Sequence, residues 1–265
     1  MKNGTQAHSR IHQGADRDIV VVHSSDIHVD DDYTARLHGG DGTAGLRAVL
    51  QTAKAIKADI VLFAGDVFEH NRLPLGLLER TARLLDNAGM RIVILPGNHD
   101  PVVPDSVYLR GGFADCGNLH ILGVTHDEAV LFPDLELEIW GHAHTDYEDM
   151  APLAKPRPRS TRWQIATAHG HYAAKPDRSA LAAPSWLIHD RHLAAIGADY
   201  VALGHWNTPA RVGPAAVEAH YSGCPEIAGT VNRITFAREG RVSVGYEPVR
   251  WSGGARPAAA LTTAL

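Results

Sequence analysis

Short runs of Ile, Val and other apolar residues recur along the chain, and each run ends in a polar cluster. The clearest runs cover residues 19–22, 60–64, 92–95, 165–168 and 200–203. Apolar runs of this length with polar ends are typical of strands that are buried on both faces. The chain is therefore predicted to build a sheet that other elements cover on both sides.

Helical periodicity fills the two gaps between the first three runs. Apolar residues lie on one helical face in each gap: Leu46, Val49, Leu50, Ala53 and Ile56 in the first, and Leu78, Ala82 and Leu85 in the second. The order strand, helix, strand, helix, strand follows for the first hundred residues.

The pattern changes after residue 118 toward shorter strands. Strands are expected at 135–140, 217–222, 231–237 and 241–249, with a helix at 185–196 and a hairpin turn at Glu239-Gly240. These elements predict a mixed α/β (α+β) domain of two sheets with outer helices. We expect the domain to cover 18–250, between a disordered tail at 1–17 and a C-terminal tail at 251–265.

Composition limits the class of protein. Of 265 residues, 45% are apolar and 21% charged, as in ordinary globular domains. No apolar run is long enough to span a bilayer, and the polar start has no apolar signal core, so a cytoplasmic protein is expected. Two cysteines are too few for a disulfide framework or a thiolate zinc site. The net charge of −5 argues against a uniformly basic nucleic-acid surface but allows a local basic groove.

Polar residues with ligand chemistry follow the apolar runs, where ligands collect in α/β sheets. They are Asp26, His28, Asp66, Asn98, His99, His169, His205 and Asn207. Each one alone could be a helix cap, a turn residue or a core histidine. Five such clusters, all after strands, favour a shared site.

The donor types indicate the chemistry of that site. Carboxylate, imidazole and amide ligands without sulfur suit Mn²⁺, Fe²⁺ or Zn²⁺, and one carboxylate can bridge two ions. Asp66 is the natural bridge. A two-metal centre activates water and clamps the attacking and leaving oxygens at phosphorus. Phosphoester hydrolysis is the expected reaction.

The motifs resemble those of a known family. Asp26-Ile27-His28, Gly65-Asp66, Gly97-Asn98-His99-Asp100, His169 and Gly204-His205 are similar to the calcineurin-like metallophosphoesterase motifs D-x-H, G-D, G-N-H-D/E, H and G-H-x-H. The segment 221–226 also resembles the Y-x-G-S-P element of SbcD-type DNA repair nucleases. The resemblance implies a four-layer αββα sandwich and a dinuclear phosphodiesterase in which a metal-bound hydroxide attacks phosphorus.

The resemblance also implies a role for each matching residue. Asp26, His28 and Asp66 would bind the first ion, and Asp66, Asn98, His169 and His205 the second. His99 and Asp100 would form the catalytic group, with His99 near the scissile phosphate. A structural alternative for His99 is a turn histidine bonded to Asp100.

Asn207 departs from the family pattern, because a histidine ends the G-H-x-H motif there. An amide oxygen is a weaker zinc ligand than imidazole, so Asn207 as a first-ion ligand would favour Mn²⁺. The alternative is simple loss of that contact.

Three further signals have two interpretations each. The second Gly-His-x-His at 141–144 is either a pair of outer histidines or a source of the missing ligand, through His142 or His144. The basic segment 155–162 is either a solvated loop or a guide for a phosphate backbone. The acidic run at 30–32 is expected to be a solvated turn.

The predicted partner is a phosphodiester substrate, with DNA and nucleotides as the two candidates, and no membrane partner is expected. An SbcC-type ATPase partner is not expected, because the chain ends before the domains that dock it in the resembling nucleases. One alternative function is a stand-alone phosphoesterase for small phosphodiesters or nucleotides. Another, of a different class, is a metal-binding scaffold whose catalysis is weakened at Asn207.

Overall fold

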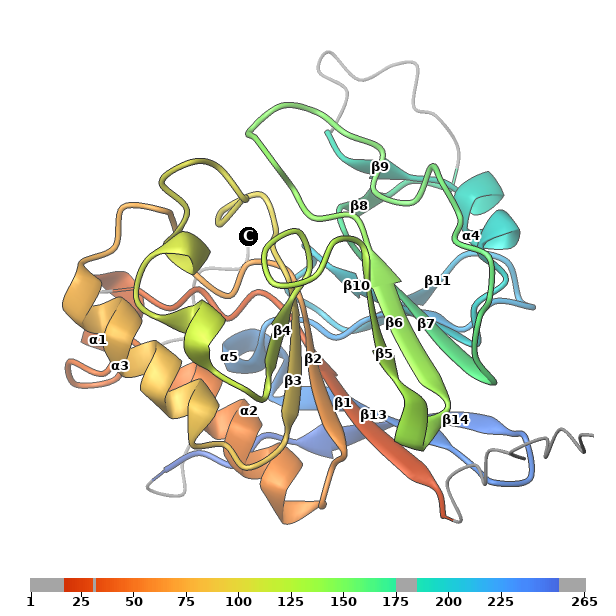
Figure 1. The fold of residues 1–265 in the computed structure, drawn as a ribbon, viewed down its shortest axis with the longest axis horizontal. Coiled ribbons are helices and arrows are strands. Elements are labelled where there is room, and N and C mark those ends of the chain that lie inside the picture. The colour runs from red at the N-terminus through yellow and green to blue at the C-terminus, as the bar shows by residue number, and fades with distance from the viewer. Residues whose placement is uncertain (1–16, 31, 175–184, 253–265) are drawn as a thin grey trace, which may run out of the picture.

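Two six-stranded sheets are stacked face to face, with helices on the outside (Figure 1). The structure is a computed structural model that describes residues 17–30, 32–174 and 185–252. The predicted tails lie almost entirely outside the described residues. Among the described residues, no helix has the length and apolar character needed to cross a membrane.

The first sheet has the strand order β14-β13-β1-β2-β3-β4. Its strands are β1 (Ile19–Ser24), β2 (Ile60–Ala64), β3 (Arg91–Leu95), β4 (Leu119–Ile121), β13 (Thr230–Phe236) and β14 (Val242–Pro248). Strands β1 to β4 are parallel, whereas β13 is antiparallel to β1 and to β14. The carboxyl ends of β1, β2 and β3 therefore meet at one edge.

The second sheet has the order β11-β12-β10-β7-β6-β5. Its strands are β5 (Ala129–Phe132), β6 (Leu137–Gly141), β7 (Trp163–His169), β10 (Tyr200–Gly204), β11 (Ala210–Val212) and β12 (Ala219–Tyr221). The central strands β6, β7, β10 and β12 are parallel. A small separate pair joins β8 (His171–Tyr172) to β9 (Leu187–Ile188).

In the described part of the chain, five helices accompany the sheets. They are α1 (Tyr33–Leu37), α2 (Ala44–Ala55), α3 (Leu75–Asp86), α4 (Asp190–Ile196) and α5 (Pro225–Ala228), with short 3₁₀ turns at Val107–Leu109, Phe113–Asp115 and Pro133–Leu135. The predicted apolar faces of α2 and α3 pack on the first sheet, and α4 packs on the second.

Three hydrophobic cores separate the four layers. Successive residues of β1 point to opposite faces, so Val22 packs under α2 and α3 while Val21 packs between the sheets. The core between the sheets also contains Leu62 and Ile165, and the third core holds Leu203 against α4. The predicted four-layer sandwich of two mixed sheets is confirmed.

The helix predicted at 185–196 is wrong in its first half. Residues 187–188 form β9, which pairs with β8, and the helix begins only at Asp190, after the cap residue His189. Trp186 has a φ of 56°, which a helix does not allow. Pairing with residues about 16 positions earlier thus overrides the local helical pattern.

The solvated turn predicted at 30–32 is wrong for Asp30. Its side chain is buried, and its carboxylate accepts hydrogen bonds from the amides of Thr34 (2.9 Å) and Ala35 (3.0 Å). Asp30 thereby fixes the start of α1, an element that the sequence pattern did not predict. Asp31 lies outside the described residues.

Candidate metal centre

The predicted ligands come together where the carboxyl ends of strands from both sheets meet. Asp26, His28 and Asp66 form one group of potential ligand atoms, and Asp66, His169 and His205 form a second. Within each group the ligand atoms all lie within 4.8 Å of one another. Asp66 belongs to both groups, as expected for a bridging carboxylate. Metal binding by these residues stays a prediction.

The backbone at this site is held in an unusual conformation. Four of the predicted ligands have positive φ: Asp26 (55°), His28 (50°), Asp66 (53°) and His205 (105°). Side chains other than glycine rarely adopt such angles, and they concentrate at functional sites. Backbone hydrogen bonds from Asp26 to Gly65 (3.1 Å) and from His28 to Asp66 (3.1 Å) hold two of the loops together.

Two motif glycines are required because His169 lies directly against them. A Cβ atom on Gly65 would collide with the imidazole ring of His169, and Gly65 also has a φ of 94°. A Cβ atom on Gly204 would collide with the carbonyl of Ala64 and with the same ring. The glycines therefore let loops from both sheets close around one histidine.

His169 shows that the centre fits a cation. Its Nδ1 lies 2.8 Å from the carbonyl oxygen of Ala64, and since a carbonyl only accepts, Nδ1 carries the proton. Nε2 faces Asp66 Oδ2 at 3.0 Å without hydrogen-bond geometry. A neutral ring would thus place two acceptors against each other, and a proton or a cation must lie between them.

The buried carboxylates point to the same conclusion. Asp26 and Asp66 are each only 2% exposed, and Asp26 Oδ2 accepts a hydrogen bond from the amide of His205 (3.0 Å). Burial raises the pKa of Asp26. Burial also acts to raise the pKa of Asp66, but the neighbouring His169 outweighs it and lowers that pKa below its usual range. Two converging carboxylates in a dry site are stabilised best by a positive ion.

The histidines differ in their charge balance. Burial disfavours the charged form of His169, but the Asp66 carboxylate outweighs burial and raises the pKa of His169 to about 9, so a metal ion bound there would displace that proton. Burial lowers the pKa of His205 to about 4, which leaves that ring neutral as a metal ligand must be. Asn98 Oδ1 is buried without a hydrogen-bond partner, so it too is available as a ligand.

His99 lies at the rim of the site and is held by Glu69. Its Nδ1 is 2.9 Å from the carbonyl oxygen of Glu69 and 3.4 Å from Glu69 Oε1, and its amide donates to Asp66 Oδ1 (2.9 Å). The other oxygen, Glu69 Oε2, is 2.9 Å from His28 Nδ1. The bond to Glu69 raises the pKa of His99 to about 9.

Glu69 lies in the motif that follows Gly65-Asp66, but the sequence interpretation gave it no role in the site. The sequence feature that could have indicated a role is the position of Glu69, three residues after Asp66 in the same loop. Only the folded loop shows that one carboxylate contacts both His28 and His99.

Asp100 is turned away from His99, and its predicted catalytic role stays a prediction. Its carboxylate is fully buried and accepts hydrogen bonds from the amides of Gly97 (2.7 Å) and Phe68 (3.0 Å) and from the hydroxyl of Tyr108 (2.6 Å). The alternative of a turn bond between His99 and Asp100 is wrong, because the His99 ring pairs with Glu69. Asp100 instead shapes the loop that carries Asn98 and His99.

All the predicted ligands fall within residues 19–209, which match the family described as calcineurin-like phosphoesterase. The chain belongs to the calcineurin-like phosphoesterase family. Members of this family are metal-dependent phosphoester hydrolases, and the two groups of ligand atoms lie on the motifs by which the chain resembles them.

Similarity to individual phosphoesterases is partial. The SbcD component of the nuclease SbcCD from Escherichia coli strain K12 is 32% identical over 85 residues, which is 31% of this chain and 21% of that protein. Its counterpart from Escherichia coli O157:H7 matches equally. The matched segment thus spans about a fifth of the length of these relatives.

Solved structures share the phosphoesterase fold. The protein TT1561 of Thermus thermophilus aligns with a TM-score of 0.53 and 12% identity, over 86% of this chain and 98% of that one. A putative 5'-nucleotidase from Staphylococcus aureus aligns with a TM-score of 0.55 and 13% identity, over 89% of this chain and 55% of that one. At this level of identity, the likeness establishes the fold alone.

The segment 221–226, which resembles the SbcD-type element, braces the site. The hydroxyl of Tyr221 donates to the carbonyl of Gly170 (2.7 Å), next to His169, and accepts a hydrogen bond from the amide of Tyr172 (2.9 Å). Trp206 stacks on the Tyr221 ring at 4.3 Å. Tyr221 thus supports the loops of His169 and His205 together.

The second Gly-His-x-His does not supply the missing ligand. His142 contacts the carbonyl of Lys155 (3.2 Å) and the carboxylate of Glu128 (3.2 Å). His144 is buried, and its Nε2 donates to the carbonyl of His169 (2.9 Å). His144 therefore supports the second group of ligands from behind, rather than replacing a ligand of the first.

Asn207 lies on the side of the first group. It is exposed, its backbone carbonyl accepts from the amide of Cys224 (3.2 Å), and it borders a cavity together with His28 and Glu69. This position is consistent with the place of the missing histidine. Its role as a ligand stays a prediction.

The basic segment 155–162 is largely occupied by bonds within the chain. Arg157 contacts Glu138 (3.5 Å), and Arg159 pairs with Asp199 (2.6 Å). Arg162 donates to the carbonyl of Arg238 (2.5 Å). These contacts disfavour the interpretation that the segment guides a phosphate backbone.

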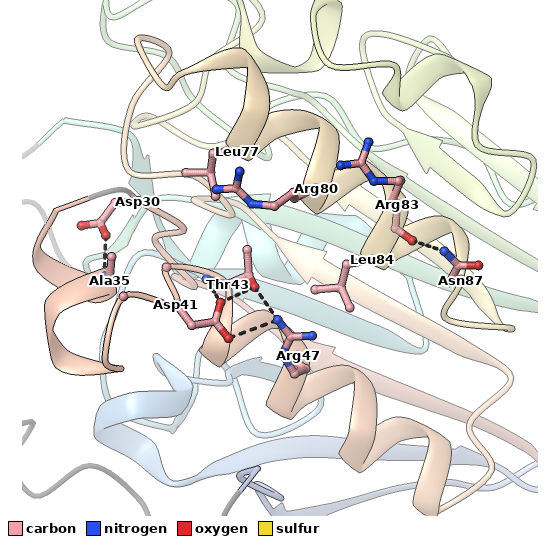
Figure 2. Close-up of a pocket in the computed structure, with 12 residues that line it drawn as sticks. Asp30, Ala35, Asp41, Thr43, Arg47, Leu77, Arg80, Arg83, Leu84 and Asn87 are labelled. Atoms are coloured by element: carbon pink, nitrogen blue, oxygen red, sulfur yellow. Dashed lines mark hydrogen bonds and ion pairs between the residues drawn. The ribbon is translucent and has the colours of Figure 1, made fainter.

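Another cavity, larger than the one beside Asn207, lies apart from the metal centre, between the α1 region, α2 and α3 (Figure 2). Its volume is about 670 Å³, and none of its lining residues belongs to the ligand groups. On one wall, Arg47 contacts Asp41 (3.1 Å) and Thr43 (3.0 Å). Arg80 and Arg83 of α3 line the opposite wall, as Figure 2 shows.

Proposed function

We propose that this protein is a dinuclear metal-dependent phosphodiesterase. The observation that carries the proposal is the pair of ligand groups that share Asp66, with His99 at their rim. One divalent ion would be held by Asp26, His28, Asp66 and Asn207, and the other by Asp66, Asn98, His169 and His205. The sulfur-free donors favour Mn²⁺, with Fe²⁺ or Zn²⁺ as alternatives.

The protein groups have separate tasks in this proposal. Bound divalent ions would lower the pKa of a water molecule and draw negative charge from the phosphoryl oxygens. Asp66 would bridge the two halves of the site, and the close packing of Gly65 and Gly204 on His169 holds loops of both sheets together. His205 is held in place by the hydrogen bond that its backbone amide donates to the Asp26 carboxylate.

His99 would act on the substrate directly. Its Nδ1 is engaged by the carbonyl and carboxylate of Glu69, so Nε2 is the nitrogen left to face the phosphate. In the charged ring that Glu69 favours, Nε2 would donate a hydrogen bond to a phosphoryl oxygen or a proton to the leaving oxygen. Asp100 and Glu69 act through His99 and are positioning residues.

Small nucleotidyl phosphodiesters are the substrate class that the surface supports best. The arginines of 155–162 are engaged within the chain, and the net charge is −5, so a polyanion has little to bind there. DNA hydrolysis is the second candidate, because 85 residues of the chain are similar to part of a nuclease.

Hydrolysis assays test the proposal. The wild type with Mn²⁺ is expected to hydrolyse bis(p-nitrophenyl) phosphate and a thymidine dinucleotide, and Asp66→Asn is expected to do neither. Labelled duplex DNA in parallel separates the two substrate candidates. Equal background rates for wild type and Asp66→Asn would contradict the proposal and favour the scaffold alternative.

A further inference from the structure

An apolar cavity of about 340 Å³ opens beside the first ligand group. Its inner wall consists of His28, Glu69 and Asn207, which border the proposed first ion. A substrate phosphate at the metal centre would therefore lie at the mouth of this cavity. Its volume is at the lower end of the range for small-molecule sites, roughly 300–1,000 Å³.

The outer wall of the cavity is mainly hydrocarbon. It is built by Tyr33 and Leu37 of α1, by Ile27, and by Ile227 of α5, and its remaining members are Thr34, Cys224 and Glu226. Tyr33 is 53% exposed, so its ring is accessible to a ligand that enters the cavity. Apolar walls beside a few well-placed polar groups are typical of a site that receives an organic ligand.

The loop that carries His28 also holds this wall in place. The hydroxyl of Thr34 donates to the carbonyl of His28 (3.0 Å), and the buried Asp30 carboxylate binds the amides of Thr34 and Ala35. Because α1 is fastened to a ligand loop, the distance between the Tyr33 ring and the metal centre is set by the fold.

The opposite side of the centre has a different character. A second cavity of about 420 Å³ borders His99 and is lined by polar side chains, among them His70, Arg72 and Asp105. Glu69 borders both cavities and separates them. The phosphate would thus have an apolar space on one side and a polar space on the other.

We propose that the apolar cavity binds an aromatic ring of nucleobase size, carried by one ester arm of the substrate. The ring would pack against Tyr33, Leu37 and Ile227 while the phosphate lies at the metal centre. This inference rests on the proposed phosphodiesterase function and deepens it, because it assigns the nucleoside or aryl arm of the substrate to one defined cavity.

Two simple probes isolate the contribution of the ring. Phenylphosphonate and methylphosphonate present the same anionic group, and only the first has a ring. With the manganese-loaded wild type, calorimetry is expected to give a Kd about tenfold lower for phenylphosphonate, as burial of one apolar ring predicts. Tyr33→Ala should reduce that ratio to about threefold or less, whereas Tyr33→Phe should keep it.

The matched control is Tyr246→Ala, because Tyr246 is 56% exposed and lies on β14, outside the cavity. This variant should keep the tenfold ratio. Equal affinity of the wild type for the two phosphonates, no binding of either, or an unchanged ratio in Tyr33→Ala would each overturn the inference. If the wild type nevertheless hydrolyses bis(p-nitrophenyl) phosphate, the proposed function stands and only the ring-binding cavity is rejected.

Discussion

Two buried polar clusters lie at the interface of the two sheets, and they differ in charge. The first contains His23, Tyr200 and Asn232, all fully buried. His23 Nδ1 lies 3.0 Å from the Tyr200 hydroxyl, which also accepts from Asn232 Nδ2 (3.1 Å). Burial lowers the pKa of His23 to about 3, so this cluster is neutral at physiological pH.

The second cluster, at the ends of the same layers, contains the carboxylates of Asp26 and Asp66. Buried atoms without hydrogen-bond partners occur in both clusters: His23 Nε2 and Asn232 Oδ1 in the first, and His169 Nε2 and Asn98 Oδ1 in the second. Such atoms alone therefore do not distinguish a metal centre from a structural network. The difference is the convergence of two buried carboxylates, which require a positive charge.

The largest predicted effect is on the charged cluster. Asp66→Asn removes the carboxylate that both ligand groups share and should lower phosphodiester hydrolysis by about 10³-fold or more. His23→Gln, in the neutral cluster, should leave the hydrolysis rate unchanged. Rate measurements on both variants test whether only the charged cluster takes part in hydrolysis. A similar loss of rate in both variants would contradict this.

His99→Gln separates catalysis from metal binding within the second cluster. Loss of a positioned proton donor should lower kcat by about 10²-fold. The metal content should remain that of the wild type, because His99 is not among the proposed ligands. Elemental analysis of the purified variant alongside its kcat checks both statements, and loss of metal would reassign His99 as a ligand.

Metal removal should destabilise the fold through the charged cluster. Saturation at about 100 times the Kd stabilises a protein by about 2.7 kcal/mol, so chelation should lower Tm by roughly 5–10 °C for a chain of this size. His23→Gln should show the same decrease, since the neutral cluster holds no ion. Scanning calorimetry with and without chelator measures the shift, and an unchanged Tm would argue against a bound cation.

The neutral cluster should respond to acid instead. The pKa of His23 is lowered from 6.5 to about 3 in the folded protein, so its contribution to stability is present above pH 6.5 and is lost as the pH falls toward 3. Between pH 7 and pH 5, protonation linked to this one group should lower the free energy of unfolding by about 2 kcal/mol.

Urea unfolding at both pH values is the measurement for His23. His23→Gln should lose correspondingly less stability on acidification, because the variant has no imidazole to protonate at that position. Parallel pH dependence in wild type and variant would show that His23 is not the titrating group.

The smallest predicted effect concerns Asn207. Restoring the imidazole of the family motif with Asn207→His should raise the affinity for Zn²⁺ relative to Mn²⁺ by about fivefold, because imidazole is the better zinc ligand. Competitive metal titrations of both proteins give that ratio. An unchanged ratio would mean that residue 207 does not contact the ion.

Much of the fold could be predicted from the sequence, and so could the meeting of the candidate ligands at one end of the sheets. Buried strands such as Ile60–Ala64 appear as apolar runs in the sequence. The polar residues that follow parallel strands lie at the same edge of the sheet. The start of helix α4 was harder to predict, because Leu187–Ile188 pairs with a strand that comes close only in the folded chain.

The roles of Glu69 and Asp100 could not be predicted from spacing. Glu69 follows one motif and Asp100 ends another, yet the Glu69 carboxylate turns toward His28 and His99 while the Asp100 carboxylate turns inward to Gly97 and Tyr108. The direction of a side chain in a loop depends on backbone angles and neighbours that a linear pattern does not encode. Asp30, which caps α1 instead of facing solvent, is a further example.

The most direct test of the dinuclear centre is the number of manganese ions bound per chain, measured by equilibrium dialysis and elemental analysis. We predict two ions for the wild type and for His23→Gln, and fewer than one for Asp66→Asn, because both groups of ligands depend on that carboxylate. A wild type that binds no manganese, or an Asp66→Asn variant that binds as much as the wild type, would contradict the account.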